Sequence, residues 1–228
     1  MGVVLLLGVG LVAFARQSAP SKNDAPTVND HWHVAFGFYR CADPANKASK
    51  AEFMPNLSGT LEQPLDPNYT KYGIHSHGDG VIHWHARALA SGKRAKLGLF
   101  FDSYNVDVTK DGIEFPASQS EMTSLTTDKV KCADKNGNAV DAQVKVVVWD
   151  QYDDATQSTS YITDFGNIRI KKDGMAVTVA FIAPGDEIPL PPTASNLPEL
   201  GAIDTGGATS TTVAGQTSST IASTTTGG

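Results

Sequence analysis

The chain has few cysteines and no excess of positive charge, and each shortage limits what the protein can be. It holds 18 Lys and Arg residues against 24 Asp and Glu residues, which gives a net charge of −6 over 228 residues. We expect no nucleic-acid partner, because no basic stripe is present to displace counterions from phosphate groups. The only cysteines, Cys41 and Cys132, lie far apart and in no Cys-x-x-Cys arrangement. In an oxidising compartment they should form one disulfide; the alternative is that Cys41 is a metal ligand near His31 and His33.

Several motifs of known metal proteins are also missing. The sequence has no His-Glu-x-x-His, which argues against the common zinc proteases. It lacks the His-Cys-His segment of multicopper oxidases and the Glu that follows His-x-His in cupins. The segment Asp134-Lys-Asn-Gly-Asn138 is not a calcium loop, because its Gly is misplaced and no Glu closes it. We interpret Asn136-Gly137 as a turn.

One long apolar run is present, at the N-terminus. Residues 2–15 are almost wholly apolar and are followed by Arg16. As a helix they would cover roughly 20 Å, less than the hydrocarbon thickness of a membrane. The run and the Ala13-Phe14-Ala15 pattern are typical of a signal peptide, although the usual basic region before the run is missing. We expect residues 1–16 to be a signal peptide or a truncated membrane anchor, and the protein to be extracytoplasmic, secreted or anchored at the cell surface.

All the histidines occur in His-x-His pairs, and none stands alone. The pairs are His31/His33, His75/His77 and His83/His85. On an extended strand, residues i and i+2 point to the same face, so each pair directs two imidazole rings to one side. Imidazole is the commonest protein ligand of transition metals. Three pairs therefore predict a metal site, whereas a single pair would be better explained by ordinary hydrogen bonding on a sheet.

The segment from His75 to His85 predicts a β-hairpin, and the length of its turn decides the chemistry. A two-residue turn would place its two His pairs on opposite faces of the sheet. A three-residue loop over residues 78–80, with Gly80 in the left-handed region, pairs His75 with His83 and brings all four rings to one face. The glycines at positions 78 and 80 permit either loop, and a shared metal site requires the three-residue loop.

The predicted ligands of a copper or zinc ion at this hairpin are His75, His77, His83 and His85. His31 and His33 would complete the site from an adjacent strand or form a second site. Asp79, at the tip of the turn, is expected to shape the turn rather than to bind the ion.

The other patterns predict an α+β domain, mainly an antiparallel β-sheet with one or two helices. Residues 31–40 alternate as a strand, residues 95–105 have the apolar spacing of a helix, and residues 144–149 resemble a buried strand. Residues 167–181 predict a hairpin around a type I′ turn at Asp173-Gly174.

Composition divides the chain into four parts. After residues 1–16, residues 17–29 form a polar linker and residues 30–192 form the folded domain. Residues 193–228 are rich in Ser, Thr, Gly and Ala and are expected to be disordered, because so few large apolar groups cannot offset the entropy of ordering.

Four segments of the domain together carry a resemblance to a known family. They are Asp30-His-Trp-His33, Gly73-Ile-His-Ser-His-Gly-Asp-Gly-Val-Ile-His-Trp-His85, Ser91-Gly-Lys-Arg-Ala-Lys-Leu97 and Ala180-Phe-Ile-Ala-Pro-Gly-Asp-Glu-Ile-Pro-Leu-Pro-Pro192. Over most of residues 30–192 the chain resembles an exported, His-rich family of actinobacteria. Members of that family typically read Gly-Ile-His-Thr-His-Gly-Asp-Gly-x-Ile-His-Ile-His-Pro at the hairpin, and this chain differs at Trp84 and Ala86. The resemblance implies location and architecture but no particular chemistry.

Three functions remain open from the sequence. The first is an exported domain that binds Cu or Zn, because neutral imidazoles without carboxylates suit these ions and not Mg or Ca. The second is a metal-dependent enzyme with an open His-ligated position, for which Asp30 and Asp79 are the only nearby bases. The third is a cell-surface interaction domain whose histidines are structural or sense acid. The membrane is a partner only through the N-terminal segment, and no protein partner or catalytic residue is indicated.

Overall fold

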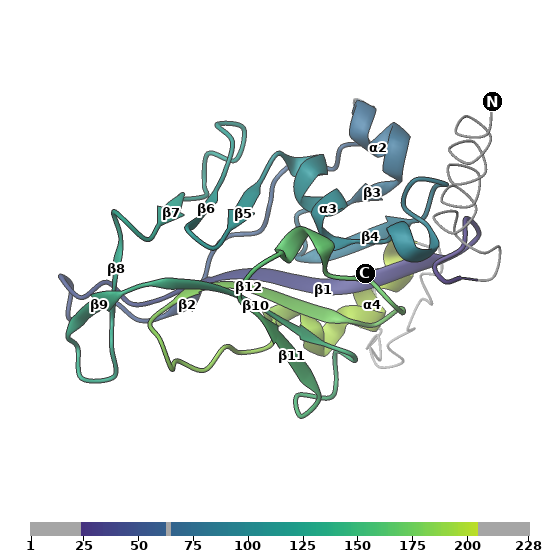
Figure 1. Ribbon diagram of the computed structural model, residues 1–228. Coiled ribbons are helices and arrows are strands. Elements are labelled where there is room, and N and C mark those ends of the chain that lie inside the picture. Colours follow the sequence, from purple (N-terminus) through teal and green to yellow (C-terminus); the bar gives the residue numbers. More distant parts are fainter. Residues whose placement is uncertain (1–23, 63–64, 205–228) are drawn as a thin grey trace, which may run out of the picture.

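The strand that bears the first His pair lies inside a seven-stranded sheet (Figure 1). The structure is a computed structural model, which describes residues 24–62 and 65–204. The strands of this sheet are β1 (His31–Arg40), β2 (Glu52–Phe53), β3 (Ile74–His75), β4 (Val81–His85), β10 (Gln143–Trp149), β11 (Ser158–Tyr161) and β12 (Ala176–Ile182). Their order is β11-β10-β12-β1-β4-β3, and β2 pairs with β1 beyond this path. Only β1 and β12 pair in parallel; the other pairs of this sheet are antiparallel.

Two small sheets and short helices complete the described part of the chain. One sheet holds β5 (Asp107–Thr109), β6 (Gly112–Glu114) and β7 (Leu125–Thr126), and the other holds β8 (Lys131–Ala133) and β9 (Ala139–Asp141). The α-helices are α2 (Pro67–Tyr72), α3 (Leu97–Tyr104) and α4 (Leu197–Asp204), and the 3-10 helices are η1 (Gly92–Arg94), η2 (Phe165–Asn167) and η3 (Pro192–Asn196). The domain is thus α+β and mainly antiparallel, as the sequence predicted.

One face of the large sheet forms the main core. Because side chains alternate along a strand, Val34, Phe36 and Phe38 of β1 share this face and are buried there. The ring of Phe36 lies 4.8 Å from that of Phe100, which belongs to α3. The helix predicted for residues 95–105 is therefore present as α3, and it covers the apolar face beside β3.

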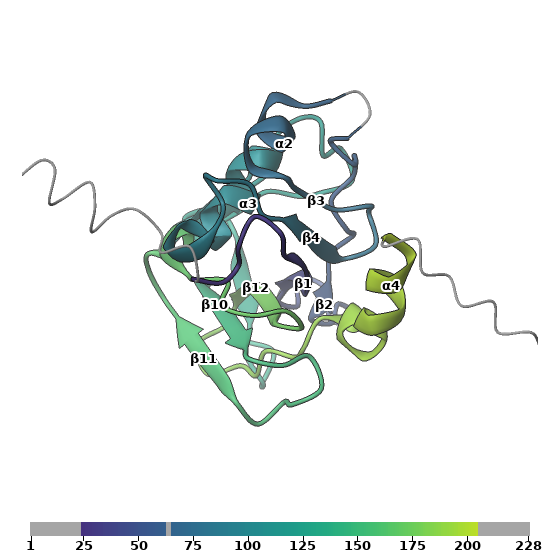
Figure 2. The same cartoon turned by 90° about the vertical axis from the view of Figure 1, so that its right-hand side faces the viewer.

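The opposite face of the sheet is covered by the segment that follows Pro192. Figure 2 shows α4 on the other side of the sheet from α2 and α3, and α4 packs against β1 and β4. Ala194 and Leu197 are buried there in a second apolar cluster. The end of the domain expected at residue 192 is therefore too early: the apolar residues of 193–204 are few, but they dock on a face that is already formed. Residues 205–228 of the expected tail lie outside the described residues.

The hairpin predicted for residues 167–181 is wrong. Its second strand, β12, lies between β1 and β10, so both of its edges are already hydrogen-bonded. Ile168 and Ile170 pair instead with the segment before α3: Leu97 N donates to Ile168 O at 2.8 Å, and Ile170 N donates to Ala95 O at 3.0 Å. The two isoleucines are buried all the same. The two segments around the Gly turn thus pair with segments that lie far away in the sequence and not with each other.

A disulfide joins the two cysteines, as predicted. Cys41 follows the end of β1 and Cys132 lies in β8, with 5.5 Å between their Cα atoms and a sequence separation of 91. The bond therefore ties one small sheet to the end of β1 that is remote from His31, and it leaves Cys41 unavailable as a metal ligand.

The described residues contain no helix long and apolar enough to span a membrane. The predicted signal peptide or anchor at residues 1–16, and residues 17–23 of the predicted linker, lie outside the described part of the chain.

Candidate metal centre

The register of three neighbouring strands brings the histidines together on one face. His31 lies opposite His85 and His33 opposite His83 in the β1–β4 pair. His75 lies opposite His83 in the β3–β4 pair. This is the register that the three-residue loop predicted, and it places the rings on the face that α4 covers. The two His pairs of the hairpin segment therefore share a side, and the pair of β1 joins them from the adjacent strand.

The hairpin itself is shorter than expected, because β3 ends at His75 and residues 76–80 form a loop. Tyr104 of α3 holds this loop from the core side: its hydroxyl accepts a hydrogen bond from Ser76 N at 2.7 Å and donates to Gly59 O at 2.9 Å. Burial is the main cause that raises the pKa of Tyr104 well above its usual value, so the hydroxyl stays protonated. Gly80 has a φ of +76°, and a Cβ atom there would lie 2.8 Å from Thr193 Cγ2. Both left-handed backbone and close approach thus require glycine at the end of the loop.

Three of the rings form a first group, which we call site A: His75, His77 and His83. Each offers a ring nitrogen, and these atoms all lie within 4.8 Å of one another. The Nε2 atoms of His75 and His77 face each other at 3.2 Å. His75 and His83 are fully buried, whereas His77 is exposed, so site A reaches the surface at His77.

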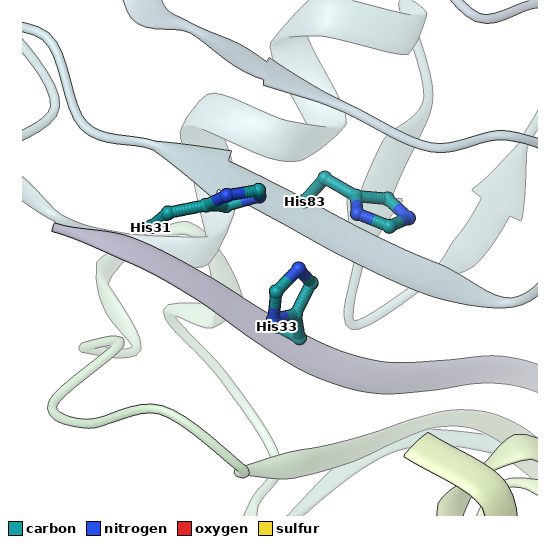
Figure 3. A group of neighbouring side chains, drawn as sticks. All are labelled: His31, His33 and His83. Carbon is teal, nitrogen blue, oxygen red and sulfur yellow. The ribbon is translucent and has the colours of Figure 1, made fainter. Parts of the chain in front are cut away.

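A second group, site B, consists of His31, His33 and His83, again with one nitrogen from each ring within 4.8 Å of the others. Figure 3 shows these rings on β1 and β4, with a nitrogen of His33 directed between His31 and His83. That nitrogen is Nε2, because Nδ1 lies on the other side of the ring, 3.9 Å from Asp173 Oδ1. The Nε2 atoms of His31 and His33 are buried.

His85, also predicted as a ligand, lies beside these groups rather than in either of them. Its ring stacks on His31 with centroids 3.7 Å apart and on His75 with centroids 5.1 Å apart. Within the described residues, sites A and B are the two groups of three that could hold an ion. His85 therefore packs against both site A and site B without belonging to either.

Carboxylates border site A. Asp79 Oδ2 lies 3.2 Å from His83 Nε2, and Glu62 Oε1 lies 3.6 Å from His75 Nε2. Burial by itself would raise the pKa of Asp79, but the hydrogen bonds from His83 and from Val81 N outweigh it and hold that pKa below its ordinary value. Asp79 is therefore ionised at neutral pH. It does shape the turn, as predicted, by accepting from Val81 N at 3.0 Å, and it also contacts a candidate ligand.

Site B is bordered by a turn and by α4. Asp173 Oδ1 accepts a hydrogen bond from His33 N at 2.6 Å, and Gly174 N donates to His33 O at 3.0 Å, so the Asp173-Gly174 turn holds the backbone beneath the ring. Gly201 of α4 lies so close that a Cβ atom there would be 2.7 Å from His33 Nδ1. A cavity of about 490 Å³ opens between this turn and α4, and His31 and His33 line it. Site B thus borders a cavity, whereas site A reaches the surface at His77.

Sequence reasoning found the histidines and missed the residues around them. Glu62, Tyr104, Asp173 and Gly201 belong to segments far from the His pairs, and no local pattern marks them. The Asp173-Gly174 dipeptide was recognised as a turn, but its contact with His33 depends on the tertiary fold.

No protein-family model, curated protein or solved structure matches the chain. Function is therefore inferred from the geometry of the His cluster and its surroundings.

Proposed function

We propose that the protein is an exported domain that binds copper or zinc through its His-x-His pairs. The observation that carries this proposal is the convergence of five imidazole rings on one sheet face, in two groups of three nitrogens within 4.8 Å that share His83. Neutral imidazoles are the form in which histidine binds a metal.

The donor set favours copper or zinc over other ions. Sites A and B are built from imidazole nitrogens, which suit Cu(II) and Zn(II), whereas Mg and Ca prefer oxygen ligands. Asp173 lies beside His33 Nδ1, the position from which a carboxylate orients an imidazole that binds a metal through Nε2. Both features support a transition-metal site with an orienting group.

Export is supported by two separate features. The Cys41–Cys132 disulfide is of the kind that persists in oxidising compartments. The apolar residues 2–15 with their Ala-x-Ala pattern are typical of a signal peptide, and an uncleaved segment would keep the domain at the membrane surface. The resemblance to an exported His-rich actinobacterial family agrees with this location.

The test is the metal content of the full chain, purified without a polyhistidine tag. After incubation with copper, zinc, magnesium and calcium and passage over a desalting column, we expect copper or zinc to be retained at one ion or more per chain. A chelator should remove it and lower the unfolding temperature, because an ion that binds only the folded state stabilises it. Metal content no higher than that of the buffer would refute the proposal. Reversible unfolding of such a metal-free protein near pH 6 would favour an acid sensor instead.

A second candidate, a metal-dependent enzyme, is favoured by the cavity at site B. Catalytic sites keep a coordination position open to water or substrate, and the cavity of about 490 Å³ gives access to His31 and His33. The test is addition of azide to the copper-loaded chain. A shift of the visible spectrum indicates an open position that a small anion can occupy, and an unchanged spectrum indicates a closed binding site.

A further inference from the structure

We propose that the His face holds two metal ions at once, with the ring of His83 as a bridge between them. One ion would lie in site A, with His75 and His77, and the other in site B, with His31 and His33. This inference rests on the proposed function, because it needs a metal-binding protein, but it concerns the number of ions and the residue that links them.

Strand order gives His83 its central position. β4 lies between β1 and β3, so His83 has His33 opposite on one side and His75 opposite on the other. The two groups of three nitrogens share His83 and no other residue. Its side chain is 1% exposed, so packing holds the ring between the two groups.

The two nitrogens of His83 point to different groups. Nε2 lies 3.2 Å from Asp79 Oδ2, on the side of the hairpin loop, where the ring of His77 is 4.7 Å away between centroids. The other nitrogen, Nδ1, is buried, and in Figure 3 it is the ring nitrogen on the side of His31 and His33. The centroid of His33 lies 5.2 Å from that of His83, edge to face. Each site therefore receives its own nitrogen from the shared ring.

A bridging ring must lose its remaining N–H proton. The first ion accepts the lone pair of one nitrogen of neutral His83. The second ion replaces the proton on the other nitrogen, and that proton passes to solvent, as metal binding to protonated ligands generally requires. The charge of the ion makes this loss favourable. No electron is transferred, and the neighbouring carboxylates of Asp79 and Glu62 offset part of the added positive charge.

Counting ions in single variants tests the proposal. The full chain without a tag is titrated with Zn(II), and we expect two tightly bound ions. His31→Ala should retain one ion, held in site A, and His77→Ala should retain one, held in site B. His83→Ala should lose tight binding at both sites, by more than 100-fold in affinity. His85→Ala is the matched control, a ring on the same face that belongs to neither site, and it should still retain two ions.

Copper provides a readout that a merely structural role of His83 would not change. Two Cu(II) ions joined through one imidazole couple magnetically, so the paramagnetic resonance intensity per copper should fall when the second equivalent is added. His31→Ala and His77→Ala, with one copper each, should show full intensity. Far-ultraviolet circular dichroism of each variant checks the fold. If His83→Ala is unfolded, His83→Gln replaces it, because Gln keeps a polar side chain that binds these ions weakly.

The outcomes separate this inference from the proposed function. Retention of no ion by the unaltered chain overturns both. Retention of a single ion overturns the bridge and leaves the metal-binding function intact. Two ions of undiminished resonance intensity, one of which survives in His83→Ala or His83→Gln, would show two independent sites and overturn the bridge alone.

Discussion

On each face of the β1–β4 strand pair, residues of the same kind lie opposite each other, but the two faces have different roles. On one face Trp32 lies opposite Trp84 and Val34 opposite Ile82. On the other face His31 and His33 lie opposite His85 and His83. The apolar face removes large side chains from water, at about 1.5–3 kcal/mol for each one fully buried. The His face contributes much less to stability, since its rings are polar.

This contrast separates the groups that stabilise the fold from the groups that we propose bind the ion. The backbone of β1 and β4 is fixed by packing against the core, so the rings on the other face are brought together before any metal binds. A preorganised ligand set loses little entropy on binding. Substitutions on the two faces of one strand should therefore have distinct effects, and the following predictions test that distinction in order of decreasing effect.

Trp84→Ala should have the largest effect. Trp84 is fully buried and its indole N–H donates to Ala90 O at 2.9 Å. Removing it leaves a cavity and an unpaired carbonyl, so we expect the free energy of unfolding to fall by about 3–5 kcal/mol in urea titrations. His85→Ala, at the next position and on the other face, should cost about 1 kcal/mol or less without metal. Equal losses for the two variants would show that the faces do not differ in this way.

Loss of the disulfide should destabilise the fold without changing metal binding. Replacing both Cys41 and Cys132 by Ser should lower the free energy of unfolding by about 2–5 kcal/mol, because the unfolded chain regains the entropy of a long loop. The number of zinc ions bound by the folded variant should be unchanged, since the cysteines lie beyond the far end of β1. A reduced zinc count would show that the two regions are coupled.

Tyr104→Phe should affect both the stability of the fold and the metal site, because Tyr104 extends from α3 to the loop that contains His77. Losing its hydrogen bond to Ser76 N should cost about 1–2 kcal/mol of stability. With the loop less constrained, zinc affinity at site A should fall 10- to 100-fold, the range typical for loss of an orienting group. Measured in a His31→Ala background, this change reports site A alone. Unaltered affinity would mean that the loop is held sufficiently by Asp79 and Gly80.

Gly201→Ala should have the smallest effect on stability and act on site B. A methyl group there would press on the ring of His33, whereas alanine favours the helix by up to about 1 kcal/mol, so the two effects nearly cancel in the free energy of unfolding. Zinc affinity at site B should fall several-fold, as measured in a His77→Ala background. Unchanged zinc affinity in that background would contradict the placement of α4 over His33.

The position of the histidines could be predicted because it depends on local geometry. A strand period of two fixes which rings share a face, and the need for a shared face selected the register in which His75 meets His83. The helix at residues 95–105 and the strand at 144–149 were likewise evident from periodicity. These features depend on residues close together in the sequence, so a local sequence pattern can predict them.

The errors concern contacts between distant segments. The residues 167–181 alternate like a hairpin, but β12 finds better partners in β1 and β10, and a period of two does not say which strand is adjacent. Residues 193–204 are too polar to predict a packed helix, and they fold against a surface that the rest of the chain provides. Glu62 and Asp173 border the cluster through the tertiary fold alone, so no spacing rule marks them.

The most direct test of the central claim is the X-ray absorption spectrum of the metal-loaded full chain. With bound zinc or copper we predict nitrogen neighbours at about 2.0–2.1 Å and the outer-shell scattering of three or more imidazole rings per ion. A first shell of oxygen without imidazole scattering would contradict the claim that the converging histidines bind the metal.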